Sequence, residues 1–153
     1  MTDKIDAGNA PRPVGAYPHA RRVGDLLFLS GLGPRTPGSN EIPGNLYDED
    51  GGLIDYDIEA QTRQLVANLD LVLEAAGATR AQLVDIIVFL TDMDRDFARF
   101  NEIYAEYFSE AAPCRTTVEI NALPTPIAVE FKCIATMATL DSETGNPDSR
   151  DSS

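Results

Sequence analysis

The segment 83–92, LVDIIVFLTD, constrains the fold more than any other, because it is a continuous apolar run between two segments of helical periodicity. Apolar residues recur at helical spacing over 58–76 and again over 97–108, whereas 83–92 is short and rich in β-branched residues. The spacing of the longer segments is typical of amphipathic helices, and the short run is typical of a buried strand. The chain therefore has to place a strand between two helices in sequence at the centre of one fold.

Further strand patterns lie on both sides of this unit. Residues 17–31 predict two strands joined by a turn, and the segments 114–121 and 127–138 predict two more, linked by the proline-rich turn NALPTP. The resulting order, ββ–α–β–α–ββ, favours an α+β fold in which a mixed sheet carries both helices on one face. The opposite face then needs a cover, and self-association is the simplest one.

The segments outside these patterns divide the chain. Residues 1–139 are expected to form a single domain, in which 1–13 is a polar arm that becomes ordered only if it docks. Residues 32–56 are rich in Gly, Pro, Asn and Asp and predict a long loop, a kind of segment that is often functional. The acidic tail 140–153 has the composition of a disordered segment. Asp57 is the expected N-cap of the first helix, with Gly77 at its C-terminus and the second helix over about 95–108.

Charge and composition exclude several classes of protein. The formal charge is −13, from 25 acidic and 12 basic residues, and this argues against nucleic acid as a partner. The longest apolar run, 86–90, is too short for a transmembrane helix, and the N-terminus lacks the apolar core of a signal peptide. We therefore expect a cytoplasmic protein without a membrane partner. Cys114 and Cys133 lack metal-ligand spacing and are expected to be buried thiols, and with one histidine a metal site is not expected.

Arg115 and Glu130 are the charges that lie within strand-like runs, in PCRTTVEI and IAVEFKCIA. Arg115, beside two threonines, suits a bound carboxylate, because the guanidinium fork matches its two oxygens; the alternative is a surface or ion-paired arginine. Glu130 shares a strand face with Lys132. It is either one member of a solvated, salt-bridged face or a partly buried carboxylate with a raised pKa that exchanges protons. A cation such as Lys132 would lower that pKa.

His19 is the only histidine, and a structural role is expected for it more than a catalytic one. The piece SGLGPR at 30–35 lacks the pattern of a phosphate loop. From the residues alone the chain is thus a small acidic α+β domain with an Arg–Glu pair on two consecutive strands.

The motifs PVGAYPHA, LLFLSG, PCRTTVEINALP and IAVEFKCIA, in this order, resemble those of the RidA (YjgF) family, and the likeness extends from about Ala10 to Met137. The resemblance implies a chorismate-mutase-like fold and a homotrimer with three active sites between subunits. It also implies hydrolysis of reactive enamines and imines to a keto acid and ammonia, without a metal or organic cofactor.

By the same resemblance, Arg115 would hold the substrate carboxylate and Glu130 would orient or activate the attacking water. Main-chain groups of Gly31 and Thr117 would help to fix the substrate. The residues implied to line the same pocket are Tyr17, Ser30 and Asn101.

The sequence also departs from the common family pattern, in its longer 32–56 loop, in Leu32 in place of glutamine, and in Lys132 in place of glutamate. Its sequence motifs are similar to those of the 2-aminomuconate deaminase branch of the family. A dicarboxylate substrate needs a second cation beyond Arg115, and the candidates are Lys132, Arg35 and His19. The alternatives are a general deaminase of 2-aminoacrylate-type imines, a ribonuclease-like translation inhibitor, which the negative charge disfavours, and a metabolite-binding module without turnover.

Overall fold

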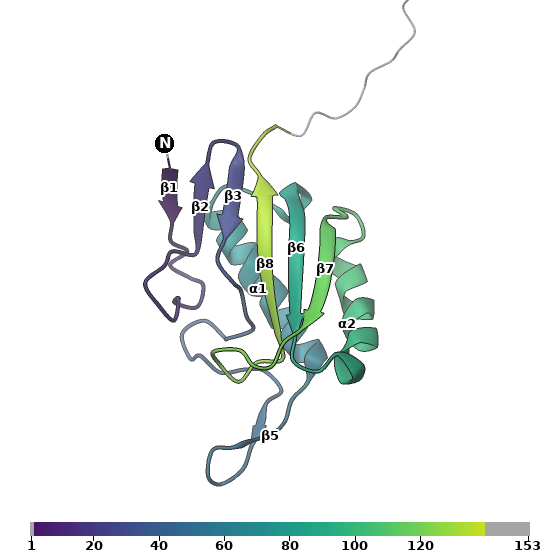
Figure 1. Cartoon of the computed structure of the whole chain (residues 1–153). Coiled ribbons are helices and arrows are strands. Elements are labelled where there is room, and N and C mark those ends of the chain that lie inside the picture. The colour runs from purple at the N-terminus through teal and green to yellow at the C-terminus, as the bar shows by residue number, and fades with distance from the viewer. Residues whose placement is uncertain (1, 140–153) are drawn as a thin grey trace, which may run out of the picture.

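A six-stranded sheet with two helices on one face forms the body of the molecule (Figure 1). The structure is a computed structural model that describes residues 2–139, so the predicted acidic tail lies outside the described residues. The strands, in the order β1-β2-β3-β8-β6-β7, are β1 (Thr2–Ile5), β2 (Ala20–Val23), β3 (Leu26–Leu29), β8 (Val129–Thr136), β6 (Leu83–Leu90) and β7 (Cys114–Glu119). The helices are α1 (Ile58–Ala75) and α2 (Met93–Phe108), with a short 3-10 helix at Arg80–Gln82. The predicted α+β fold is confirmed.

The strand β6 lies between β8 and β7, so the two strands that carry Glu130 and Arg115 are not neighbours. It pairs antiparallel with β8 and parallel with β7. A parallel pair requires a crossover connection, and α2 provides it. The strands of Arg115 and Glu130 are thus consecutive in the chain, as expected, but not adjacent in the sheet.

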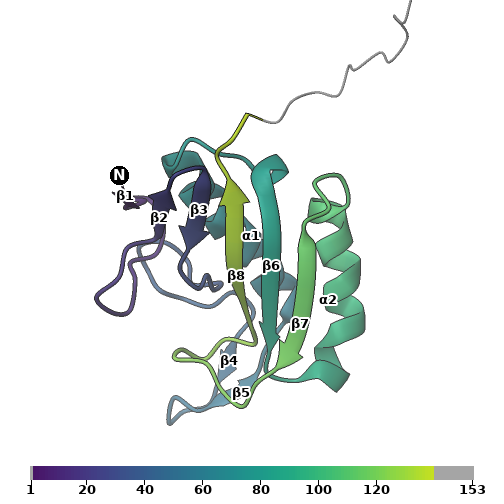
Figure 2. The same cartoon turned by 45° about the horizontal axis from the view of Figure 1, so that its top comes forward.

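Residues alternate along β8 between two environments. Val129, Phe131 and Cys133 are fully buried beneath the helices, whereas Glu130 and Lys132 lie on the opposite face. No helix of residues 2–139 covers that opposite face, which we call the open face (Figure 2). It also carries the partly exposed apolar side chains of Val23, Leu26 and Phe28. Cys133 is buried as expected, but Cys114 is exposed because it begins the edge strand β7.

The helix ends follow their sequence signals. The Asp57 side chain accepts a hydrogen bond of 3.1 Å from the backbone N–H of Ala60, and Gly77 follows α1 with φ +78°. A positive φ is unfavourable for residues with a Cβ, which is why glycine occupies this position. The second helix begins two residues before the predicted start, because the Asp92 side chain caps it by accepting from Arg95 N–H.

The N-terminal arm docks on the body. Its strand β1 pairs antiparallel with β2, and Ala7 and Ala10 are buried. His19 Nδ1 accepts a 3.0 Å hydrogen bond from Ala7 N–H, and its Nε2 lies 2.8 Å from the carbonyl oxygen of Pro11. Because Nδ1 accepts, the ring proton resides on Nε2 and is donated to Pro11. The histidine thus holds the arm.

The long loop contains a hairpin that the sequence did not indicate. Its strands β4 (Leu46–Tyr47) and β5 (Leu53–Asp55) form a separate two-stranded sheet that projects from the body at the end where β8 begins (Figures 1 and 2). Arg95 Nη2 donates to Asp55 and to the carbonyl oxygen of Tyr56, and the Tyr56 hydroxyl donates to the buried Asp96. These contacts join the base of the hairpin to the first turn of α2.

Two buried amides of α1 hold the loops that reach the sheet. Asn68 Nδ2 donates to the carbonyl oxygens of Gly33 and Arg35, at 2.9 and 2.8 Å. Gln61 accepts from Ala128 N–H and donates to the side chain of Asn45. Polar groups on the buried face of a helix are costly unless they are paired, and here the partners are loop backbone and side chains.

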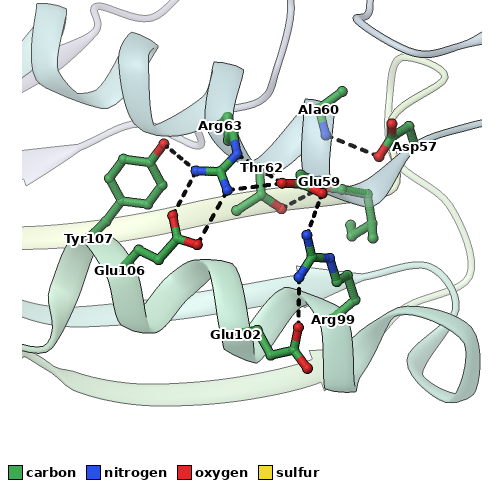
Figure 3. A network of polar contacts seen from close by, with 10 residues as sticks. Asp57, Glu59, Ala60, Thr62, Arg63, Arg99, Glu102, Glu106 and Tyr107 are labelled. Carbon is green, nitrogen blue, oxygen red and sulfur yellow. Dashed lines mark hydrogen bonds and ion pairs between the residues drawn. The ribbon is translucent and has the colours of Figure 1, made fainter.

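A polar network at the surface connects α1 to α2 (Figure 3). Arg63 donates to Glu59, Glu106 and the Tyr107 hydroxyl, and Arg99 donates to Glu59 and Glu102. The two arginines hold the pKa values of Glu59 and Glu106 below their usual range. The charged side chains of this network are substantially solvent-exposed, so its ion pairs add little stability.

The buried amide of Asn68 is expected to matter more for stability than this exposed network. Asn68→Ala leaves two carbonyl oxygens of the loop without their donor, which we expect to lower the free energy of unfolding by about 2 kcal/mol or more. Arg63→Gln, the comparison variant, should lower the free energy of unfolding much less, and its effect should diminish further in high salt. Urea unfolding of both variants measures the difference, and equal losses would contradict this account.

Candidate functional site

Glu130 lies on the open face against Gly31. A Cβ at Gly31 would lie 3.0 Å from Glu130 Cδ, so the absence of a side chain there allows the carboxylate to approach the backbone. Burial raises the pKa of Glu130 above its usual range. No lysine or arginine of residues 2–139 forms an ion pair with it. A half-buried carboxylate without a cation is suited to accept and release a proton.

Lys132 does not neutralise Glu130, although both side chains lie on the open face. Its ammonium group donates a hydrogen bond to the carbonyl oxygen of Leu29 on the neighbouring strand β3. The expected lowering of the Glu130 pKa by this lysine is therefore not found, and burial decides the direction.

The chain after β3 runs beside the start of β8. The backbone of Leu32 exchanges two hydrogen bonds with Phe131, which places Gly31 next to Glu130. Ser30 Oγ donates to the carbonyl oxygen of Pro18 at 2.7 Å. Tyr17 is exposed, and its hydroxyl accepts from Val14 N–H at 3.3 Å. Sequence-predicted residues thus gather around Gly31.

A small cavity of about 40 Å³ extends from this position. It reaches Arg35 in the long loop, whose guanidinium donates to the carbonyl oxygen of Arg12 and to the Asn40 side chain. The lining residues are Pro11, Pro13, Tyr17, His19, Ser30, Gly31, Leu32, Gly33, Arg35 and Asn68.

Arg115 lies on the other face of the sheet. It is paired with Ile86, which is fully buried beneath the helices, so its side chain points to the helix side. Its guanidinium carbon is 4.7 Å from the ring centre of Tyr104 and 5.7 Å from that of Phe100. Among residues 2–139 it has no carboxylate partner. It is a cation held by aromatic faces, with its hydrogen-bond donors available.

Three buried polar atoms near Arg115 have no hydrogen-bond partner within the described part of the chain: Asn101 Oδ1, Tyr104 Oη and Thr117 Oγ1. Thr117 is two residues after Arg115 on the same face of β7, and Asn101 precedes Tyr104 by one turn of α2. Burial raises the pKa of Tyr104 to about 12, so its hydroxyl stays protonated and can donate. Such atoms are rare in proteins, and a bound water, a ligand or another chain could each supply the partner they need.

The predicted site residues therefore form two groups within one chain. The Glu130 group, with Gly31, Ser30 and Tyr17, belongs to the open face, and the Arg115 group, with Thr117 and Asn101, belongs to the helix face. A single chain does not bring the two together. Tyr104 also belongs to the Arg115 group, although it was not predicted as a site residue. Its position one helical turn after Asn101, a predicted site residue, could have indicated that it lies in the same site.

Comparisons with known proteins show which sequences and structures the chain resembles. A family model described as Endoribonuclease L-PSP matches residues 7–137. A RutC family protein of Pyrococcus horikoshii is 39% identical over 135 residues, which are 88% of this chain and 98% of that protein. The chloroplastic Reactive Intermediate Deaminase A of Arabidopsis thaliana is 34% identical over 133 residues, 87% of this chain and 65% of that protein. The structure of the E. coli YjgF gene product is similar with a TM-score of 0.76 and 31% identity, over 89% of this chain and 99% of that one.

The chain belongs to the RidA (YjgF) family. The family resemblance noted from the motifs is confirmed, and so is the fold that it implied, since the YjgF structure shares it over nearly its whole length. The family includes reactive intermediate deaminases, which supports hydrolysis of C–N bonds as the general activity. Within residues 2–139 no helix is long and apolar enough to span a membrane.

The carboxyl of Glu130 in this RidA-family chain should titrate above those of Glu59 and Glu106. Burial disfavours the charged form of Glu130, whereas Arg63 and Arg99 favour the charged forms of the other two. A pH titration of the 13C-labelled side-chain carboxyls by NMR measures the order, with Glu130→Gln assigning the resonance. A Glu130 midpoint at or below those of Glu59 and Glu106 would show that burial does not control it.

Proposed function

We propose that this chain is a 2-aminomuconate deaminase, which hydrolyses the enamine or imine of 2-aminomuconate to 2-oxo-3-hexenedioate (4-oxalocrotonate) and ammonia. The observation that supports the proposal most is the uncompensated carboxylate of Glu130 against Gly31, in a family that includes reactive intermediate deaminases. The reaction proposed needs no metal or organic cofactor, and we propose the cytoplasm as its location.

The proposed chemistry is addition of water to a carbon–nitrogen double bond. After the enamine takes a proton on carbon, the imine carbon is electrophilic, and the Glu130 carboxylate accepts a proton from the attacking water. The new C–O bond gives a tetrahedral amino alcohol. Glu130 then returns its proton to nitrogen, the C–N bond breaks and ammonia leaves. The hydroxyl becomes the keto oxygen and releases its proton to solvent, which balances the proton that the enamine carbon took from solvent at the start. A carboxyl with a raised pKa suits both transfers.

Arg115 is proposed to hold the carboxylate next to the reacting carbon. Its guanidinium is half-buried, lies over aromatic rings and has no carboxylate partner within residues 2–139. Thr117 and Asn101, with their unpartnered side-chain oxygens, are proposed to complete this end of the site. Positioning of this kind is most of what an already electrophilic carbon requires.

A site that contains both Arg115 and Glu130 requires two copies of the chain, because the two side chains lie on opposite faces of one sheet. We propose that the copies form the homotrimer that the family resemblance implies, with one site at each of its three interfaces. The apolar side chains of Val23, Leu26 and Phe28 on the open face support self-association there.

Three alternatives remain to be tested. A general deaminase would accept 2-aminoacrylate as well as the dicarboxylate. A metabolite-binding module would hold ligands at Arg115 without turnover. The description of the family model names an endoribonuclease, but the charge of −13 disfavours RNA as the substrate of this chain.

Ammonia release from freshly generated 2-aminomuconate should be fast with the wild type. Glu130→Gln removes the proton acceptor and Arg115→Ala removes the carboxylate clamp, so each should lower kcat/KM by about a hundredfold or more. Coupled detection of ammonia measures this, with 2-aminoacrylate generated in situ as the second substrate. Efficient clearance of 2-aminoacrylate without turnover of 2-aminomuconate would identify a general imine deaminase instead.

A mixture of the two inactive variants should regain activity if the site is shared. In mixed oligomers an interface is intact when Arg115 comes from a Glu130→Gln copy and Glu130 from an Arg115→Ala copy. When the variants mix at random in equal amounts, each side of an interface has the required variant in about half of the cases. About a quarter of the interfaces are then intact, and we expect about a quarter of wild-type activity. The measurement is turnover after co-refolding, with each variant refolded alone as the control. Activity that stays at the level of the single variants would rule out a shared site.

A further inference from the structure

Arg35 is a second cation near the candidate site that has no acidic partner within residues 2–139. Among residues 2–139, four other arginines form ion pairs, namely Arg63, Arg80, Arg95 and Arg99. The acceptors of Arg35 are both uncharged: the carbonyl oxygen of Arg12 at 2.6 Å and the Asn40 side-chain oxygen at 3.1 Å. A guanidinium has five N–H donors, so these two bonds leave its charge and three donors for another group.

The position of Arg35 links it to the proposed site. It lines the same cavity as Tyr17, Ser30 and Gly31, and Gly31 is the residue against which the Glu130 carboxylate lies. The cavity volume of about 40 Å³ is too small for a whole six-carbon substrate but sufficient for one carboxylate group. Arg35 thus borders a cavity that is large enough for one carboxylate group and that is also lined by Gly31, the neighbour of Glu130.

The other two candidate cations fit this role less well. Both ring nitrogens of His19 are used by the N-terminal arm, and a neutral ring that accepts at Nδ1 and donates at Nε2 offers nothing to an anion. Lys132 is not among the residues that line the cavity, and its ammonium donates to the backbone of Leu29.

We propose that Arg35 binds the second carboxylate of a dicarboxylate substrate in this cavity and is the residue that makes the chain prefer dicarboxylates. The inference rests on the proposed function for the identity of the reaction, but the binding site itself does not depend on turnover. The chain's net charge of −13 repels anions in general, so a local guanidinium is needed to hold a doubly charged one. Its planar fork also suits a carboxylate better than an ammonium does.

A pair of stable probes tests the inference without turnover. trans,trans-Muconate and sorbate share one six-carbon diene chain, but only muconate carries a carboxylate at both ends. Isothermal titration calorimetry should show that the wild type binds muconate about tenfold or more tightly than sorbate, as expected for a charge-assisted hydrogen bond. Arg35→Gln should abolish this preference while sorbate affinity stays unchanged, and Arg35→Lys should keep only part of it.

Arg12→Gln is the matched control, because it removes the same charge from a neighbouring exposed residue whose side chain does not line the cavity. It should retain the preference for muconate. Unchanged sorbate binding by Arg35→Gln shows that the site is intact, which separates loss of the anion contact from loss of folding. The inference is overturned if the wild type shows no preference, if the preference survives in Arg35→Gln, or if Arg12→Gln reduces it equally.

The same variants distinguish failure of this inference from failure of the proposed function. If 2-aminomuconate is not hydrolysed but the preference for muconate depends on Arg35, the dicarboxylate site stands and the assigned reaction is wrong. If 2-aminomuconate is hydrolysed equally well by wild type and Arg35→Gln, the deaminase stands and the role of Arg35 is wrong.

Discussion

The period of two along β8 is the constraint on which the rest of the structure depends. It places Phe131 and Cys133 beneath the helices and Glu130 on the open face. Because β8 pairs with β3 on one side and β6 on the other, two ladders fix its register. A slip of one residue would expose Phe131 and bury the carboxylate beneath the helices, so packing of the apolar core holds the proposed catalytic group in place.

The same alternation on β7 puts Arg115 on the helix face, next to the rings of α2. One sheet therefore presents a carboxylate on one side and an unpaired guanidinium on the other, with β6 between their strands. Neither group is complete as a site alone: Glu130 has no cation, and the atoms around Arg115 lack partners within residues 2–139. Association of copies would join the two groups and cover the apolar side chains of the open face, so packing and chemistry favour the same assembly.

Local patterns in the sequence predicted the helices, the strands β2, β3, β6, β7 and β8, and the faces of β8, because each depends on periodicity within one segment. The strand β1 lies in the arm, for which no strand was predicted. The local patterns did not predict that β6 separates β7 from β8, since strand order depends on contacts between distant segments. The hairpin at β4 and β5 was missed because its strands are too short to show alternation. The structural role of His19 could not be specified for a similar reason. Its hydrogen-bond partners, Ala7 and Pro11, lie in the N-terminal arm, whose sequence shows no helix or strand periodicity. The resemblance to a family named the site residues, but not their division between two faces.

Electrostatics explains how so acidic a chain could bind the anionic substrate proposed for it. Most of its arginines on the helices are matched with carboxylates, as Arg63 and Arg99 are in the surface network, and contribute no attraction to a ligand. Arg115 and Arg35 differ because their neighbours are aromatic rings or neutral oxygens. A charge that is partly buried and unpaired acts over a short range through a medium less polarisable than water, where its attraction exceeds the screened repulsion of distant surface carboxylates. The proposed anion binding thus depends on where guanidinium groups without an ion pair, such as Arg115 and Arg35, lie in the fold, and not on the sign of the net charge.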